Sequence, residues 1–160
     1  PLGDVQYYDK RHLFRMAQEH QHYSAGQEKL VTSLAGINCC PLICYDLRFP
    51  VFSRNLGKEV DVLVYVANWP AKRAAHWRAL LQARAIENQC YVVGVNRLGI
   101  DGNTVAYQGD SMVVDFQGEI IADAFDRAGL HYAALDVGAL NDYRAAFPAW
   151  MDQDGFTLDL

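Results

Sequence analysis

Apolar residues occur along the chain in short runs of strand length, separated by turn signals. The run Val60–Ala67 is apolar at nearly every position, which is typical of a strand buried on both faces of a sheet. Tyr91–Val95 has the same character. Paired strands are predicted around two turn dipeptides, Ala35-Gly36 and Gln117-Gly118: Leu30–Leu34 with Ile37–Ile43, and Met112–Phe116 with Glu119–Ala124. We also expect strands at Val5–Asp9 and His131–Val137.

Helical spacing of apolar residues is strongest over Ala71–Asn88, which follows Pro70. A short helix is predicted at Phe49–Leu56, ending at Gly57, and another at Ala139–Phe147. The polar segment Arg11–Lys29 has no sustained period, so we expect a long loop there, with one helical turn near Phe14–Glu19. Strands that alternate with helices predict an α/β layered protein whose sheet is covered on both faces.

Composition narrows the class of protein. The 160 residues are 51% hydrophobic and 21% charged, as in ordinary globular domains, and no internal repeat or linker divides them. A net charge of -5 without a basic cluster argues against nucleic acid and anionic membranes as partners. No apolar run approaches the ~20 residues that span a bilayer.

Three of the four cysteines, Cys39, Cys40 and Cys44, lie on one segment, and the fourth is Cys90. Neighbours on a strand cannot easily form a disulfide, so we expect free thiols and a cytoplasmic location. The cluster also lacks the paired spacing of structural zinc sites, so no metal is expected.

Cys44 follows an apolar strand and precedes a predicted helix. A thiol at such an elbow lies near a helix N-terminus, whose partial positive charge favours the thiolate. The backbone N–H of Tyr45 would face a developing oxyanion. From the pattern alone, a small buried apolar residue is the favoured interpretation of Cys44, because buried cysteines are common.

Two kinds of partner are available to this thiol. Lys10 lies at the end of a predicted strand and would lower the pKa of the Cys44 thiol if the two side chains lay side by side. The same sequence position also fits a lysine in solvent, which is the commoner case. A Cys-His dyad is the competing arrangement, and spacing does not choose among the five histidines, His12, His20, His22, His76 and His131.

Several sequence blocks in a fixed order are a more specific signal of a protein family than any single residue. They are Tyr8-Asp9-Lys10-Arg11-His12-Leu13-Phe14, Gln18-Glu19, Ser24-Ala25-Gly26, Cys44-Tyr45-Asp46-Leu47-Arg48-Phe49-Pro50, Ala67-Asn68-Trp69-Pro70, His76-Trp77, Ala83-Arg84-Ala85-Ile86-Glu87-Asn88-Gln89 and Phe147-Pro148-Ala149-Trp150. In this order the blocks resemble the nitrilase superfamily of carbon-nitrogen hydrolases, and within it the bacterial omega-amidases that act on 2-oxoglutaramate.

This resemblance implies an α-β-β-α sandwich and a Glu-Lys-Cys triad. By position, Cys44 matches the nucleophile, Lys10 the triad lysine and Glu19 a second glutamate that orients the site. The Tyr45 N–H matches the oxyanion donor. Asn68 and Trp69 match the loop beside the acyl pocket.

The general-base glutamate of the family precedes the lysine, and none of the nine residues before Lys10 is a glutamate. We therefore expect residues 1–160 to form the C-terminal part of a single carbon-nitrogen hydrolase domain whose N-terminal part is absent. On its own, such a piece should expose apolar sheet faces and be insoluble or inactive.

For several polar residues, both a functional and a structural role fit the sequence. Arg48 could bind a substrate carboxylate, or it could pair with Asp46 or another acid nearby. Arg84, Glu87 and Asn88 lie on the long predicted helix, and there we favour a structural role. Tyr107 and Asp110 could line the pocket.

The function expected from the resemblance is hydrolysis of the omega-amide of a small 2-oxo dicarboxylate, such as 2-oxoglutaramate, through a Cys44 thioester. It needs no cofactor. A homodimer is expected on the same ground. The alternatives are another enzyme of this superfamily, a nitrilase or an N-carbamoyl amino acid amidohydrolase, and a non-catalytic interaction fragment without the glutamate.

Overall fold

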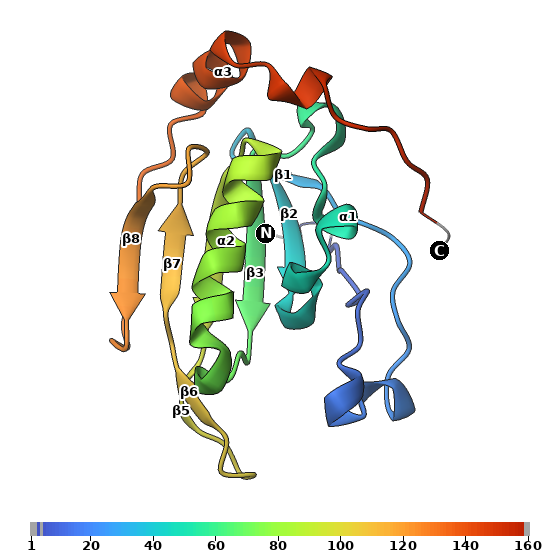
Figure 1. The fold of residues 1–160 in the computed structure, drawn as a ribbon, viewed down its shortest axis with the longest axis vertical. Coiled ribbons are helices and arrows are strands. Elements are labelled where there is room, and N and C mark those ends of the chain that lie inside the picture. Colours follow the sequence, from blue (N-terminus) through green and yellow to red (C-terminus); the bar gives the residue numbers. More distant parts are fainter. Residues whose placement is uncertain (1–2, 4, 159–160) are drawn as a thin grey trace.

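The computed structural model describes residue 3 and residues 5–158. Its main feature is a six-stranded sheet, made of β1 (Thr32–Leu34), β2 (Ile37–Ile43), β3 (Val62–Ala67), β4 (Tyr91–Asn96), β7 (Ser111–Val114) and β8 (Ile120–Phe125) in that spatial order. The central strands β2, β3 and β4 run parallel, and the outer pairs are antiparallel. Figure 1 shows this sheet behind the long helix α2 (Ala74–Asn88). The mixed α/β prediction is therefore confirmed.

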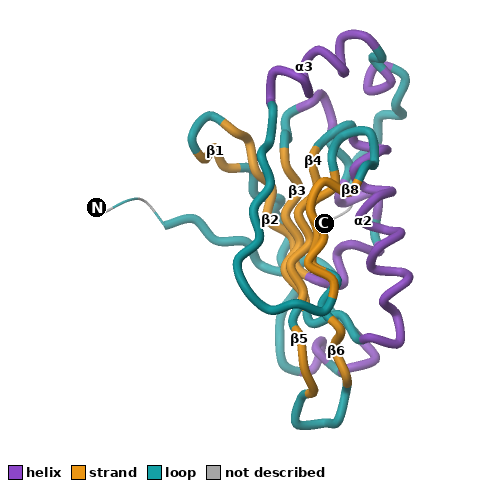
Figure 2. The backbone as a smooth tube through the Cα atoms, turned by 90° about the vertical axis from the view of Figure 1, so that its left-hand side faces the viewer, coloured by secondary structure: helices purple, strands orange, loops and turns teal. Residues whose placement is uncertain are grey.

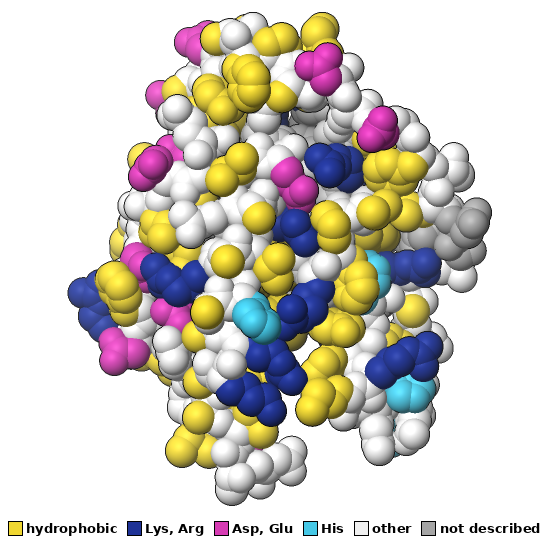
Figure 3. Space-filling view, in the orientation of Figure 1, with side chains coloured by type: hydrophobic (Ala, Val, Ile, Leu, Met, Phe, Trp, Pro, Cys, Tyr) yellow, Lys and Arg dark blue, Asp and Glu magenta, His cyan; other side chains and the backbone are white. Residues whose placement is uncertain are grey.

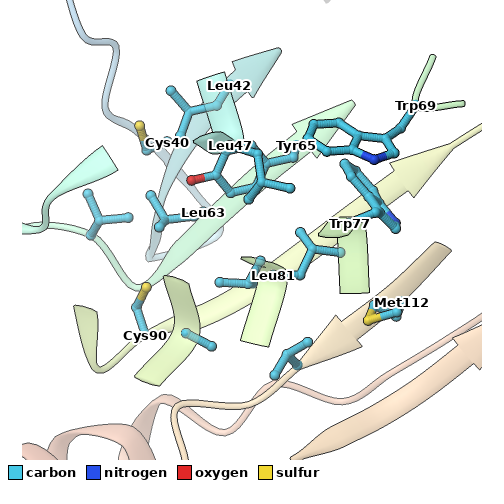
Figure 4. Close-up of a cluster of buried hydrophobic side chains, with 14 of the residues drawn as sticks. Cys40, Leu42, Leu47, Leu63, Tyr65, Trp69, Trp77, Leu81, Cys90 and Met112 are labelled. Carbon is cyan, nitrogen blue, oxygen red and sulfur yellow. The ribbon is translucent and has the colours of Figure 1, made fainter. Parts of the chain in front are cut away.

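The long helix covers one face of the sheet and forms the main core with it. Trp77, Leu81 and Ala85 of α2 are fully buried against Leu63 and Val92 of the strands beneath. Figure 4 shows Trp77 and Leu81 of the helix facing Leu63 and Tyr65 of the sheet. Burial of a side chain the size of leucine or valine contributes about 1.5–3 kcal/mol, so this layer is a main source of stability.

A glycine permits the close approach of α2 to β4. A side chain at Gly94 would collide with Leu81 and Trp77 of the helix. The glycine thus lets the helix lie directly on the sheet, above the strands that carry the site.

The opposite face of the sheet is only partly covered. Helix α3 (Val137–Ala146) packs over one end of it, where Leu140 contacts Val62 and Tyr91 in a second core. Figure 2 shows α2 on one side of the sheet and mainly loop on the other. Towards the far end, Val66 is 49% exposed and Val95 47%. Exposed apolar positions on this face agree with the expectation for such a chain, whereas complete burial of both faces is not found.

Several predicted elements differ from the structure. Residues 5–9 form no strand, because Val5 and Tyr7 are 87% and 79% exposed and have no surface to pack against. Residues 131–136 are also irregular. There the carboxylate of Asp136 accepts a hydrogen bond from the Ala139 N–H (2.9 Å) and begins α3 instead of continuing a strand.

The short helix after the elbow is interrupted earlier than predicted. α1 spans only Pro50–Ser53, and a 3-10 turn, η4, follows at Leu56–Lys58. Asn55 separates the two, because its backbone N–H donates to Asn88 Oδ1 (2.8 Å) and its amide donates to the Val60 carbonyl (2.8 Å). These bonds hold the backbone outside a helical path.

The remaining elements lie near the site. The loop 11–29 contains two 3-10 turns, η1 (Arg15–Ala17) and η2 (Glu19–Gln21), where one helical turn was predicted. The turn η3 (Cys44–Arg48) follows β2, and η5 (Ala71–Arg73) leads into α2. The hairpin of β5 (Leu98–Ile100) and β6 (Ala106–Gln108) was not predicted. A last 3-10 turn, η6 (Ala149–Met151), follows α3.

Candidate active site

The carboxyl ends of β2, β3 and β4 meet at one edge of the sheet, and a cavity of about 690 Å³ opens there. Its walls come from the segments that leave these strands and from the loop 11–29. Side chains that line it and that matter below are Lys10, Phe14, Met16, Glu19, Cys44, Tyr45, Arg48, Asn68, Trp69, Lys72, Arg73, Asp101 and Tyr107. Figure 3 shows Lys and Arg side chains beside the notch between the two lower lobes of the surface. Parallel sheets generally bind ligands at this edge.

Cys44 is the first residue after β2, and its backbone is left-handed, with φ of +47°. Such a conformation costs a non-glycine residue on the order of 1–3 kcal/mol and is concentrated at functional sites. It turns the chain sharply, so the side chain leaves the sheet and lines the cavity. Its Sγ lies 3.9 Å from the carbonyl oxygen of Asn68, at the end of the neighbouring strand.

The surroundings of the Cys44 thiol act on its pKa in two directions. Burial raises the pKa above its ordinary value, and the nearby Lys10 ammonium opposes this effect without overcoming it. The sequence-based expectation of a thiolate stabilised at the elbow is therefore wrong for the isolated chain. A thiol that stays protonated needs a general base before it can attack a substrate.

Lys10 and Glu19 form an ion pair at the edge of the same cavity. Lys10 Nζ donates to Glu19 Oε2 over 2.6 Å, and the Phe14 N–H donates to the same oxygen over 2.8 Å. The pair orients the ammonium within the cavity that Cys44 lines. The structure thus brings together three of the residues singled out in the sequence, Lys10, Glu19 and Cys44.

Asp46 is the centre of the local hydrogen bonding, and sequence reasoning gave it no role beyond a partner for Arg48. It is completely buried. Its carboxylate accepts from the backbone N–H groups of Ile43 (2.9 Å) and His12 (2.9 Å), and from the Tyr8 hydroxyl (2.8 Å). His12 Nδ1 also lies 2.8 Å away. Asp46 therefore ties the elbow to the segment that carries Lys10. The sequence signal that could have indicated this role is the position of the aspartate, two residues after the start of the turn that follows β2.

Tyr45 lies in the first turn of η3. Backbone N–H groups at the start of a helical turn have no partner within it, which leaves the Tyr45 N–H suited to an oxyanion. The Tyr45 ring packs against Phe14 and Phe49, with centroid distances of 4.9 and 5.1 Å. These contacts join the elbow to the loop 11–29.

Arg48 points its guanidinium towards Trp69, with Cζ 4.7 Å from the ring centroid. Its Nη2 lies 3.1 Å from His76 Nδ1. The alternative in which Arg48 pairs with Asp46 is not observed, since Asp46 is occupied by the groups given above. Within residues 5–158, Arg48 has no ion pair with a carboxylate.

Asn68 and Trp69 both line the cavity, as predicted, after β3. Trp69 is 3% exposed and held firmly: its backbone N–H donates to Asn96 Oδ1 (2.7 Å), and its Nε1 donates to the Arg73 carbonyl (2.8 Å). Asn96 also donates to the Trp69 carbonyl (3.0 Å). Trp69 is thus a rigid wall, and Asn96 is a supporting residue that sequence reasoning missed.

No histidine is among the described residues that line the cavity with Cys44. His12 is stacked on Phe49 (3.8 Å) and bound to Asp46, and His76 contacts Arg48. His20 and His22 are exposed on the loop, and His131 lies near the Arg127 carbonyl. The Cys-His arrangement is not formed.

Among the other polar candidates, one lines the cavity and the others have structural contacts. Tyr107 lines the cavity and donates to Asp101 Oδ2 (2.9 Å), whereas Asp110 is buried away from it and paired with Arg78. Arg84 donates to the Leu47 carbonyl (2.7 Å) and to Glu87 (2.8 Å), as expected for a structural residue.

Within residues 3 and 5–158, the structure contains neither a metal-binding cluster nor a helix suited to a membrane. No group of three or more His, Cys, Asp or Glu side chains among them could hold a metal ion. None of the described helices has the length and apolar character needed to cross a membrane. The four cysteines are free thiols.

Comparison with known proteins decides the family. The carbon-nitrogen hydrolase profile matches residues 2–145. The chain belongs to the carbon-nitrogen hydrolase family. Among relatives, it is 57% identical to an omega-amidase, YafV, of Escherichia coli K12, over 99% of this chain and 62% of that protein. It is 37% identical to a 2-oxoglutaramate amidase of Bacillus subtilis, over 92% of this chain and 57% of that one.

A solved structure of this hydrolase superfamily supports the same assignment. The protein XC1258 of Xanthomonas campestris, which carries an arsenic adduct in its active site, superposes with a TM-score of 0.93 at 47% identity, over 96% of this chain and 60% of that one. The chain spans about three fifths of the length of the omega-amidase relatives that it matches over 99% of its own length.

Proposed function

We propose that this chain carries the nucleophile and lysine of a thiol-dependent amidase that hydrolyses the omega-amide of a small 2-oxo dicarboxylate, 2-oxoglutaramate in particular. The observation that carries the proposal is the shared cavity of Cys44 and the Lys10–Glu19 pair. The names of the relatives at 57% and 37% identity support the substrate class.

The proposed reaction begins with removal of the Cys44 proton. Because burial raises the pKa of this thiol, a base must act, and we assign that role to a glutamate supplied from outside these 160 residues. The sulfur attacks the carboxamide carbon. Lys10 and the Tyr45 N–H stabilise the resulting oxyanion.

The tetrahedral intermediate then breaks its carbon–nitrogen bond. Ammonia leaves with the proton taken by the base, and a thioester to Cys44 remains. Water attacks the thioester with help from the same base, which releases the carboxylic acid and restores the thiol. Glu19 keeps the Lys10 ammonium in place throughout, and no cofactor takes part in this proposal.

Substrate binding is assigned to Arg48, Asn68 and Trp69. Arg48 has no carboxylate partner among the described residues, so its guanidinium is available for an anionic group of the substrate. The Trp69 ring packs against that guanidinium, and the Asn68 carbonyl lies beside the Cys44 sulfur.

The test is ammonia release by the full-length protein from 2-oxoglutaramate, a simple nitrile and an N-carbamoyl amino acid. We expect release from the first substrate at the highest kcat/KM, and loss of turnover in Cys44→Ser. Cys39→Ser is the matched control, since that thiol lies outside the cavity. Release only from the nitrile or the carbamoyl compound would refute the substrate class, and an active, folded Cys44→Ser variant would refute the mechanism.

We also propose a cytoplasmic location, which the four free thiols support, and a homodimeric assembly, which rests on family resemblance. Light scattering on the purified full-length protein measures the second directly, and a monomeric mass would contradict it.

A further inference from the structure

The cavity around Cys44 holds more positive than negative side chains. Its acids are already used: Glu19 binds Lys10, and Asp101 accepts from the Tyr107 hydroxyl and from the backbone N–H of Asn103 and Val105. On the other side of the cavity, Arg48 and Arg73 have no carboxylate partner within residues 5–158. Two guanidinium groups thus remain for an anionic ligand.

Arg73 is the one of these that no motif singled out. It ends the turn η5, immediately before α2, and its backbone carbonyl is fixed by the hydrogen bond from Trp69 Nε1. The side chain reaches across the cavity to the loop 11–29. Its Nη2 lies 3.4 Å from Met16 Sδ, and its Cζ lies 5.7 Å from the centre of the Phe14 ring.

Both of these contacts are weak for a guanidinium. A thioether sulfur is a poor acceptor, and Met16 is itself 72% exposed. A carboxylate offers two oxygens that match the guanidinium geometry and a full opposite charge. A carboxylate within reach of the Arg73 guanidinium would therefore be a stronger partner than the thioether.

We propose that Arg73 is a specificity-determining residue that binds the carboxylate of the 2-oxo acid substrate together with Arg48. The proposal rests on the proposed function. The two arginines flank Trp69, one stacked on its ring and the other bound to its Nε1 through the carbonyl. A substrate whose amide carbon lay at Cys44 would extend towards this pair.

The experiment separates binding from turnover. In the full-length protein, the alkylation rate of Cys44 by iodoacetamide is measured with increasing 2-oxoglutarate, the expected product, and with pentanamide, a neutral amide. We expect 2-oxoglutarate to protect Cys44 of the wild type. In Arg73→Met, the 2-oxoglutarate concentration needed for the same protection should be about tenfold higher or more, because a charge-assisted pair is lost. Protection is expressed relative to the alkylation rate of each variant without ligand, and the effect of pentanamide should not change.

Two variants control this result. Met16→Leu removes the sulfur but keeps the apolar side chain, and protection should stay as in the wild type. Arg127→Met removes an arginine with a comparable aromatic contact (Cζ 5.8 Å from the Phe125 ring) far from the cavity, and should also have no effect. Arg73→Lys should be intermediate, since it keeps the charge without the planar fork.

Three results overturn the proposal. They are unchanged protection in Arg73→Met, an equal loss in Met16→Leu, and an equal loss for the neutral amide, since the last two would mean that Arg73 only holds the loop. Wild-type protein that 2-oxoglutarate does not protect, but that hydrolyses the nitrile, would refute the proposed function itself. The two failures are thus distinguishable.

Discussion

At the scale of single residues, Cys44 combines a strained backbone with a thiol that its surroundings keep neutral. The positive φ places the sulfur in the cavity, and the Asp46 carboxylate holds the preceding Ile43 N–H so that the turn cannot relax. Lys10 is the cation that opposes the burial effect on the thiol pKa. Reactivity is therefore governed by the few groups that surround the sulfur.

The first prediction concerns Lys10. Replacing it by Met removes a positive charge that lowers the Cys44 pKa, so that pKa should rise further. The measurement is the rate of Cys44 alkylation against pH in the full-length protein, where the midpoint of Lys10→Met should lie above that of the wild type.

Lys29→Met is the control for this experiment, because Lys29 is a partly buried lysine whose ammonium binds the Arg54 carbonyl, away from the cavity. It should leave the midpoint where it is. A midpoint that stays the same or falls in Lys10→Met would show that the ammonium does not act on the sulfur.

The second prediction concerns Asp46. In Asp46→Asn, one acceptor oxygen becomes an NH₂ group that faces the donors of Tyr8, His12 and Ile43, inside a fully buried site. We expect a loss of unfolding free energy of about 2–4 kcal/mol. Urea unfolding measures it, and Asp115→Asn, in an exposed turn, is the comparison.

At the scale of elements, Arg78 fastens α2 to the outer strands. It binds Asp123 of β8 (2.5 Å) and Asp110 before β7 (3.1 Å), and its hydrogen bond lowers the pKa of Asp123. A carboxylate with a lowered pKa stabilises the folded state above its ordinary pKa, near 4, and this contribution is lost as the pH falls through the lowered value.

The third prediction follows. Arg78→Met should reduce stability at pH 7 by about 1 kcal/mol and should weaken the loss of stability on acidification below pH 4. Thermal unfolding between pH 2.5 and 7 measures both effects. Arg15→Met, in the exposed turn η1, should keep the wild-type profile; equal pH profiles for Arg78→Met and wild type would contradict the role assigned to the pair.

The secondary-structure elements differ in how well the sequence predicts them. The runs Val60–Ala67 and Ala71–Asn88 are confirmed within a few residues, because burial and helical periodicity leave a strong pattern. Residues 5–9 have a strand pattern without a strand, since no neighbour pairs with them, and 131–136 give way to the Asp136 cap. The β5–β6 hairpin was missed because its residues are largely exposed and lack alternation.

For the site, local patterns singled out Cys44 and Lys10, and family resemblance added Glu19 and gave all three their proposed roles. Their convergence in one cavity depends on contacts between residues far apart in the chain. The bond from His12 to Asp46 and the bond from Trp69 to Asn96 are examples, and no local spacing specifies them. Arg73 was missed for the same reason, since its position follows from the start of α2 and the fold of the loop 11–29.

At the scale of the whole molecule, the two faces of the sheet differ. One is sealed by α2, and the other leaves Val66 and Val95, which are paired in register, about half exposed. Adjacent apolar side chains on an open face favour association with another surface.

The fourth prediction tests that face. The 160-residue chain alone should bind a hydrophobic dye and self-associate, and Val66→Asp should reduce both in light scattering. In the full-length protein, the same substitution should lower stability by about 2 kcal/mol or more if other residues cover this face. Glu119→Asp, on an exposed turn, should change neither, and unchanged stability in full-length Val66→Asp would show that the face remains open.

The arrangement of the parallel strands has one more consequence, for engineering. Most of the cavity walls belong to segments that leave the sheet at a single edge, and the β5–β6 hairpin pairs with none of the six strands of that sheet. The tip of this hairpin, with Asp101, Asn103 and Val105, can be exchanged for tips of other length without disturbing the layer beneath α2. In the proposed reaction, substrate size would thereby be separated from folding, and a graded set of hairpins is a direct way to alter the acyl preference.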